Sequence, residues 1–384
     1  MAIAILLIAI GILVPDLYIW NEYIRDLGLI WSVIYWAPSA AFTVLTVMAM
    51  CWRRFDAGVM NILTALLLGV GLPKALFALV AWLGATSGGL WRYAEPLGFY
   101  GGLAVAAFVM TLSFFGLFYG WRIVRIKRVD LEFDGLPEAF DGYRIAHITD
   151  FHIGTYLRSA DTVGKIVDAI NGTRPDVVAF TGDLVNLSPD EVTLFVPELS
   201  RLSAPDGVLS ILGNHDYCNY VRYGTPDGRS HAQRRLEELQ HRAGWRLLKN
   251  ENVVIHRGDE EIAIVGVEND GKPPFPARGD LRKAMRGLPQ GIFTVLMSHD
   301  PSHWRRRVLP ETEIPLTLSG HTHGMQFRIG KFSPSQFAYN EWGGLYEENE
   351  RMLYVSTGIG SNLTFRFGAW PEIVLITLRK RRRE

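Results

Sequence analysis

Nine polar side chains of types that bind metals or move protons occur in five short blocks. The blocks are Asp150-Phe-His152, Gly182-Asp183, Gly213-Asn214-His215-Asp216, His299 and Gly320-His321-Thr322-His323. Oxygen and imidazole ligands without cysteine suit Mn, Fe or Zn better than Ca or Mg, which prefer oxygen alone. Seven candidate ligands exceed one ordinary site, but they fit two metals that share one carboxylate. Two metals about 3.5–4 Å apart can hold both the attacking and the leaving oxygen of an in-line displacement.

The blocks follow short apolar runs that predict strands, and helical patterns lie between the first runs. The strands that precede the blocks are Ile145–Ile148, Asp176–Thr181, Gly207–Leu212, Ile292–Met297 and Leu316–Leu318. Helices are expected at Ser159–Asn171, with apolar residues on one face, and at Val192–Leu202. Repeated βα units of this kind predict an α/β sheet with one site along its carboxyl edge.

Further strands are expected on both sides of this region. They are Ile123–Phe133, Trp245–Leu248, Val253–His256, Ile262–Val267, Met352–Ser356 and Ile373–Leu378. Their number predicts a second sheet packed on the first.

As a set, the five blocks resemble the calcineurin-like, binuclear metallophosphoesterases, whose pattern is D-x-H, G-D, G-N-H-D/E, H and G-H-x-H. All are present in order between Tyr143 and Gly324. The resemblance implies a four-layer αββα sandwich. It also implies that Asp150, His152 and His323 hold one metal, that Asn214, His299 and His321 hold the other, and that Asp183 bridges them. His215 would stabilise the transition state or protonate the leaving oxygen, with Asp216 orienting it.

The residue types fit this chemistry by themselves. Neutral imidazoles and few carboxylates leave a metal pair with net positive charge, which lowers the pKa of a bridging water so that hydroxide forms near neutral pH. The same charge neutralises phosphate oxygens. We therefore expect two divalent ions, with manganese favoured and iron or zinc possible, and hydrolysis by a metal-bridging hydroxide without a phosphoenzyme.

Residues 1–121 are mostly apolar and predict a membrane domain, followed by the phosphoesterase domain at 122–384. Four stretches reach the about 20 residues that a span needs, at about 1–20, 29–52, 59–83 and 99–119. Tryptophan and tyrosine lie near their ends, as in interfacial belts. Asp16 and Lys74 are ionisable residues in or near these spans, and each is next to a proline that would let partners or water reach it.

The basic residues predict the orientation. The second loop and the region after the fourth span carry six Lys or Arg, whereas the first and third loops carry Arg25 and Arg92 alone. This bias predicts a multi-pass protein of the cell (inner) membrane with a cytoplasmic catalytic domain. Two cysteines form no disulfide framework, which fits a reducing compartment.

The substrate is expected to be a phosphodiester or a pyrophosphate. Within the family, the chain is similar to membrane-associated enzymes, including one that hydrolyses UDP-2,3-diacylglucosamine. A lipid-linked substrate and contacts with membrane lipids follow from that similarity, and Arg305, Arg306, Arg307 and Arg366 are candidates to meet phosphate or uridine. The alternatives are a phosphomonoesterase or protein phosphatase, or an inactive membrane sensor or scaffold. The net charge is zero and no basic, aromatic groove is evident, so nucleic acid is not expected as a partner.

Overall fold

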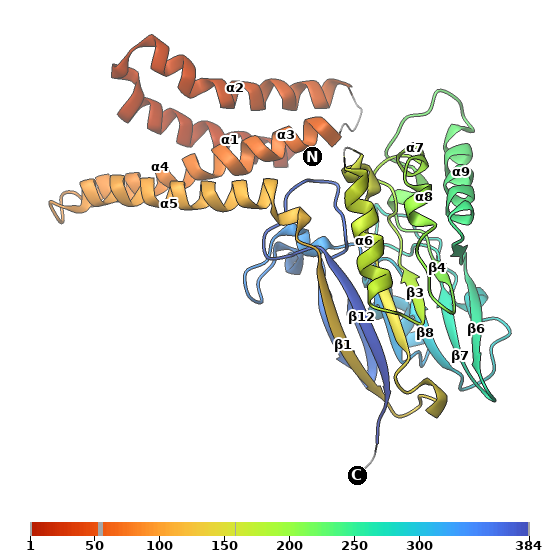
Figure 1. Cartoon of the computed structure of the whole chain (residues 1–384). Helices are drawn as coiled ribbons and strands as arrows, with labels where there is room; N and C mark the ends of the chain where they lie inside the picture. Colours follow the sequence, from red (N-terminus) through yellow and green to blue (C-terminus); the bar gives the residue numbers. More distant parts are fainter. Residues whose placement is uncertain (1, 53–56, 158, 383–384) are drawn as a thin grey trace. The chain divides into compact units, whose positions relative to one another are not determined.

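The computed structural model describes residues 2–52, 57–157 and 159–382. The chain divides into two compact units, each treated by itself below (Figure 1). Unit 1 comprises Met1–Gly120 with Leu363–Phe367, and unit 2 comprises Trp121–Asn362 with Gly368–Glu384. The short segment Leu363–Phe367 therefore groups with the N-terminal helices, although the sequence pattern placed it in the second domain.

Unit 1 is helical. Its helices are α1 (Ala2–Ile19), the π-helix η1 (Trp20–Ile24), η2 (Arg25–Leu27), α2 (Leu29–Trp52), α3 (Ala57–Leu66), the π-helix η3 (Leu67–Gly71), α4 (Leu72–Thr86) and α5 (Ala94–Phe118). Three stretches in the described part are long and apolar enough to cross a membrane, namely Leu29–Ala49, Gly58–Thr86 and Ala94–Arg122.

Four spans were expected, and three of them are supported by the structure. The first expected span forms α1, and this helix is not among the three that qualify in the described part. Met1 and the side chains of residues 2–10 lie outside the described residues, as do Arg53 and Arg54 of the second loop.

A close glycine contact and two hydrogen bonds connect parts of unit 1. A Cβ atom at Gly84 of α4 would lie 2.6 Å from the Cα of Gly98 in α5, so only glycine permits these two helices to pack this closely. The segment Leu363–Phe367 is attached by hydrogen bonds from the Thr364 N–H to Asn61 (2.9 Å) and from the Arg366 N–H to the carbonyl of Gly116 (3.1 Å).

Unit 2 contains two mixed sheets of six strands. In spatial order, the first consists of β1 (Arg125–Phe133), β12 (Glu372–Lys380), β2 (Arg144–Ile148), β3 (Val177–Phe180), β4 (Val208–Ser210) and β5 (Arg246–Leu247). The second consists of β10 (Gly344–Glu348), β11 (Arg351–Val355), β9 (Leu316–Ser319), β8 (Phe293–Met297), β7 (Glu260–Gly266) and β6 (Glu251–Arg257). Strands β2 to β5 are parallel, and so are β7, β8, β9 and β11.

The two sheets pack face to face through apolar side chains from both, such as Ile145, Leu209, Ile264 and Leu318, all fully or almost fully buried. Helices cover the outer faces. The first sheet carries α6 (Ala160–Gly172), α7 (Asp190–Thr193), α8 (Val196–Leu199) and α9 (Gly228–Arg242), which Figure 1 shows as one layer. The second carries α10 (Leu281–Ala284), η8 (Trp304–Val308) and α11 (Leu309–Glu311). An α/β domain with two mixed sheets is thus confirmed.

The pattern that predicted α6 also explains its packing. Val163, Ile166, Val167 and Ile170 recur at helical spacing, and all four are buried against the first sheet. Because helices and strands both bury apolar faces here, the strand ends that carry the polar blocks are held in a rigid frame.

Candidate metal centre

The structure brings all five polar blocks to one place. Asp150 and His152 follow β2, Asp183 follows β3, and Asn214 and His215 follow β4 in the first sheet. His299 follows β8, and His321 and His323 follow β9 in the second sheet. The carboxyl ends of parallel strands meet at one edge of a sheet, and the two sheets present these edges to each other.

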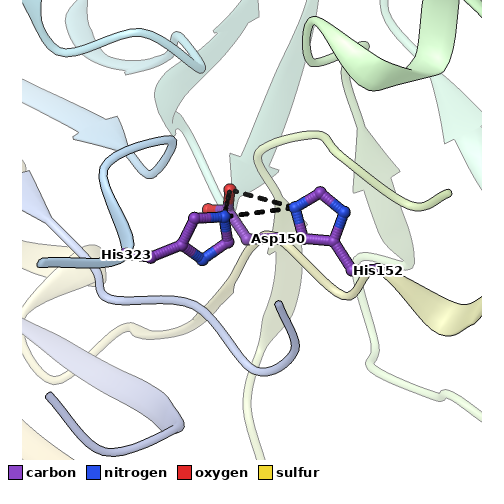
Figure 2. Close-up of side chains that lie close together, drawn as sticks. All are labelled: Asp150, His152 and His323. Atoms are coloured by element: carbon purple, nitrogen blue, oxygen red, sulfur yellow. Dashed lines mark hydrogen bonds and ion pairs between the residues drawn. The ribbon is translucent and has the colours of Figure 1, made fainter. Parts of the chain in front are cut away.

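A first cluster consists of Asp150, His152 and His323 (Figure 2). The Nε2 atoms of the two histidines are 3.2 Å apart. The Oδ1 atom of Asp150 lies 3.4 Å from Nε2 of His323 and 3.9 Å from Nε2 of His152. Asp150 and His152 are fully buried, whereas His323 is partly exposed.

A second cluster consists of Asn214, His299 and His321. The Oδ1 atom of Asn214 lies 2.8 Å from Nδ1 of His321 and 3.2 Å from Nε2 of His299. These two imidazole nitrogens are 3.3 Å apart. Three potential ligand atoms therefore converge on one point here too.

Asp183 lies between the two clusters. One oxygen, Oδ2, is 3.6 Å from Nε2 of His152 and 3.2 Å from Nε2 of His299. Its other oxygen, Oδ1, accepts a hydrogen bond from the backbone N–H of His215 (2.8 Å), which fixes the carboxylate. A single carboxylate oxygen is thus within reach of both ligand sets.

These residues fit two divalent ions. Oδ1 of Asp150 is buried and accepts no hydrogen bond from the described residues, which is costly for a carboxylate oxygen that has no other partner. The imidazole nitrogens that face each other at 3.2 and 3.3 Å are also close enough for one cation to bind both members of a pair. The arrangement agrees with the two-metal interpretation of the sequence.

The ligand loops have an unusual backbone conformation. Five of the seven candidate ligands have positive φ, namely Asp150 (51°), His152 (44°), Asp183 (59°), His321 (72°) and His323 (51°). Non-glycine residues rarely adopt this left-handed region, and such strain collects at functional sites. The surrounding fold therefore holds these side chains in directions that the local sequence would not choose.

Burial and neighbouring charges set the protonation of the cluster. Burial lowers the pKa of His152 well below its usual range and also lowers that of His321. His299 is different: burial alone would lower its pKa, but the charge and hydrogen bond of Asp183 raise it to about 10. Burial raises the pKa of Asp183, but the histidines around it, His299 first, outweigh this and hold it well below its usual range.

His215 lies beside the first cluster, and each ring nitrogen has a partner. Nδ1 donates to the carbonyl of Asn186 (2.6 Å), which leaves the lone pair on Nε2, facing the amide nitrogen of Asn362 at 3.0 Å. The ring packs edge-on against His152, with centroids 4.9 Å apart. His215 can also be grouped with His152 and Asp183 as a potential metal-binding set, so its role requires a direct test.

Asp216 was expected to orient His215, but its carboxylate binds backbone N–H groups of the neighbouring loops. Its carboxylate accepts hydrogen bonds from four backbone N–H groups, those of Asp183 (2.8 Å), Leu184 (2.9 Å), Val185 (3.3 Å) and Gly213 (2.9 Å). The ring nitrogens of His215 contact Asn186 and Asn362 instead. Asp216 thus connects the loops that follow β3 and β4, and burial together with the charge of Asp183 raises its pKa to about 7.

Three residues around the centre were not identified from the sequence. The Tyr339 hydroxyl lies 2.7 Å from Nε2 of His321. Tyr220 packs on His215, with ring centroids 4.4 Å apart, and its hydroxyl accepts from the Asn214 amide (3.0 Å). Asn362 is the third. None belongs to one of the five polar blocks.

The arginines considered as phosphate or uridine ligands have other partners. Arg305 forms ion pairs with Glu341 and Glu348, Arg306 pairs with Asp270, and Arg307 pairs with Glu311. Arg366 is fully buried, in the segment that belongs to unit 1. These contacts favour a structural role for the run Arg305–Arg307.

Comparison with known proteins agrees with this geometry. The family model described as calcineurin-like phosphoesterase matches residues 143–325, which contain every block of the centre. A Bacillus subtilis protein described as an uncharacterized metallophosphoesterase, YkuE, is 31% identical over 258 residues, covering 64% of this chain and 82% of that protein. The chain belongs to the calcineurin-like phosphoesterase family. It is accordingly a hydrolase of the metallophosphoesterase type.

Two other relatives of this phosphoesterase bear on the membrane and the substrate. A Danio rerio protein named as a transmembrane protein with metallophosphoesterase domain is 27% identical, over 72% of this chain, and the chain spans 62% of that protein. The Chlamydia muridarum UDP-2,3-diacylglucosamine pyrophosphatase LpxG is 25% identical, over 66% of this chain and 89% of that protein.

We expect Gly320→Ala to weaken metal binding by the phosphoesterase at least about tenfold, as changes beside metal ligands do. A Cβ atom at position 320 would overlap the Asp150 carboxylate and the side chain of Thr149. Metal content after dialysis against a graded chelator measures the effect. Gly343→Ala is the control, because a Cβ atom there meets nothing within 4 Å. Equal metal retention in both variants would contradict the assignment of Asp150.

We also expect metal affinity to fall as the pH falls from 8 to 6. Without metal, His299 carries a proton in this range because its pKa is raised to about 10, and a metal must displace that proton. His152 has a lowered pKa and is already neutral, so it adds no proton. One released proton corresponds to about a tenfold change per pH unit. Calorimetry of manganese binding in buffers of different ionisation enthalpy counts the protons, and release of none would refute this protonation state.

Proposed function

We propose that this chain is a membrane-anchored, two-metal phosphoesterase that hydrolyses a phosphodiester or pyrophosphate bond. The observation that carries the proposal is the position of Asp183, whose Oδ2 atom is within reach of both ligand clusters while His215 lies beside them. A shared carboxylate is what two adjacent cations require. The candidate membrane-spanning stretches of unit 1 and the relatives named as transmembrane proteins support the anchoring.

Two divalent ions, when bound, would activate a water molecule as the nucleophile and neutralise charge on the phosphate oxygens. The mixed nitrogen and oxygen ligands without sulfur favour manganese, with iron or zinc as alternatives. Asp150, His152 and His323 would hold one ion. Asn214, His299 and His321 would hold the other, and Asp183 would bridge them.

His215 would act on the leaving group. Because Nδ1 donates to the Asn186 carbonyl, Nε2 is the atom that can exchange a proton with substrate. Asn362 faces that same nitrogen and is placed to orient the ring or to exchange its contact for one with substrate. His215 and His323 are partly exposed while Asp150 and His299 are buried, so substrate would approach from the side of His215.

The orientation inferred from the basic residues does not depend on whether α1 crosses the membrane. With spans at Leu29–Ala49, Gly58–Thr86 and Ala94–Arg122, the loop containing Arg53 and Arg54 and the chain after Arg122 are on the same side. That side has the larger number of basic residues. We therefore propose a cytoplasmic catalytic domain in the inner membrane.

The finer proposal is a lipid-linked substrate such as UDP-2,3-diacylglucosamine. It is supported by the similarity to LpxG, which covers 89% of that protein. Membrane attachment is compatible with such a substrate, since its acyl chains remain in the bilayer while its pyrophosphate is hydrolysed.

We expect His215→Ala to retain both metals and to lose about 10²–10⁴-fold in turnover, the usual contribution of a positioned acid or base. Metal analysis and hydrolysis of bis(p-nitrophenyl) phosphate with manganese measure the two quantities. His231→Ala, which changes an exposed histidine on α9, is the matched control. A parallel loss of metal and activity would assign His215 as a ligand instead.

A substrate panel tests the lipid proposal separately. With manganese, we expect the full-length protein to release UMP from UDP-2,3-diacylglucosamine faster than it cleaves p-nitrophenyl phosphate, a monoester. Hydrolysis of simple diesters without UMP release would refute the lipid substrate and leave the phosphoesterase intact. Preference for the monoester would favour a phosphomonoesterase, and no hydrolysis at all would favour a sensor or scaffold.

A further inference from the structure

Unit 1 contains an apolar groove that the hydrolytic chemistry does not use. Its volume is about 360 Å³, within the range of about 300–1,000 Å³ that is typical of ligand pockets. Its walls include Tyr23, Val70, Phe77, Leu103 and Met110. Leu103 and Met110 of α5 are 45% and 41% exposed, so the groove opens on the outer face of that helix.

Both described π-helical segments of unit 1 contribute to this groove. Tyr23 and Ile24 come from η1, and Gly69 and Val70 come from η3. A π-turn is a local bulge in a helix and occurs frequently at functional sites. Gly69 adds no side chain at this point, where a Cβ atom would meet nothing nearer than the ring of Phe114 at 3.8 Å.

An ion pair between buried Asp16 and partly exposed Lys74 adjoins the groove. The Lys74 ammonium donates to Oδ1 of Asp16 (2.9 Å), to the carbonyl of Tyr35 (3.2 Å) and to Ser39 (3.5 Å). The Tyr35 hydroxyl donates to the same Asp16 oxygen (3.0 Å). Among the described residues that line the groove, Lys74 is the only charged one, and its three donors already have acceptors.

These observations limit the kind of ligand that can bind in the groove. A charged headgroup would have to displace Asp16 from Lys74 and leave that carboxylate buried without its cation, which is costly. A helix of a second protein chain, about 10–12 Å across with its side chains, is too wide for a cavity of this volume. The helices that form most of the groove lie in candidate membrane spans, where the surrounding solvent is lipid.

We propose that this groove binds one acyl chain of a bilayer lipid. The chain enters between Leu103 and Met110, lies along the π-helical turns of η1 and η3, and ends against the neutral Asp16–Lys74 pair. The site requires no free charge and does not depend on the phosphoesterase activity of unit 2. It gives the helices a binding role in addition to anchoring.

The test uses the full-length protein in phosphatidylcholine bilayers that contain a small fraction of phosphatidylcholine with a diazirine in one acyl chain. After irradiation, mass spectrometry of the digested protein locates the labelled residues. We expect labelling to concentrate on Tyr23, Leu103 and Met110, compared with Phe108, which is 63% exposed on α5. Uniform labelling of the exposed face of α5 would overturn the proposal.

Two groove-filling variants and one control complete the experiment. Ala106→Phe places a ring in the groove, and we expect it to abolish most labelling of Tyr23. Ala107→Phe puts the same side chain on the next, exposed position of α5 and should leave the labelling unchanged. Gly69→Leu fills the groove from η3 and gives an independent result if Ala106→Phe fails to fold. Labelling of Tyr23 at the level of the unaltered protein in a folded filled variant would refute an acyl chain at this position.

Discussion

The carboxylate of Asp183 is the group on which the candidate metal centre depends. It follows β3 in the first sheet, yet its Oδ2 atom faces His299, which follows β8 in the second sheet, at 3.2 Å. The same atom faces His152 of the first sheet at 3.6 Å. The carboxyl ends of β3 and β8, which belong to different sheets, must therefore lie close together. Because metal–ligand distances tolerate only about 0.2 Å, the apolar packing between the sheets sets the geometry of the centre.

Asp216 fixes the two loops that carry Asp183 and Asn214. Its carboxylate holds four backbone N–H groups of the loops after β3 and β4, including the N–H of Asp183 itself. Burying a charged group costs free energy, and placing the Asp216 carboxylate near that of Asp183 increases this cost. The four hydrogen bonds to Asp216 compensate for its burial.

In unit 1, too, charged side chains among apolar helices are paired with partners. Lys74 and Asp16 neutralise each other, and Tyr35 and Ser39 form further hydrogen bonds with them. A charge among membrane-spanning helices is tolerated only with partners of this kind. The pairing explains how two ionisable residues persist beside an apolar groove.

The amino-acid sequence by itself determined the identity of the candidate ligands and the strands that carry them. Apolar runs such as Ile145–Ile148 predict a buried strand, and the polar residues directly after them lie at the carboxyl end of that strand. Asp150 and His152 are therefore found at a strand end from local pattern alone. Hydropathy predicted four spans in unit 1, and three of them qualify among the described residues.

Only the tertiary structure decided which atoms meet. Asn362 reaches His215 across 147 positions of the chain, and His321 reaches Asn214 across 107. Asp216 binds backbone N–H groups instead of the neighbouring His215, and Leu363–Phe367 packs with helices that precede it by more than two hundred residues. Local periodicity carries no information about such contacts. They arise when the two sheets, or the helices of unit 1, bury their apolar faces and thereby place distant polar groups within hydrogen-bonding distance.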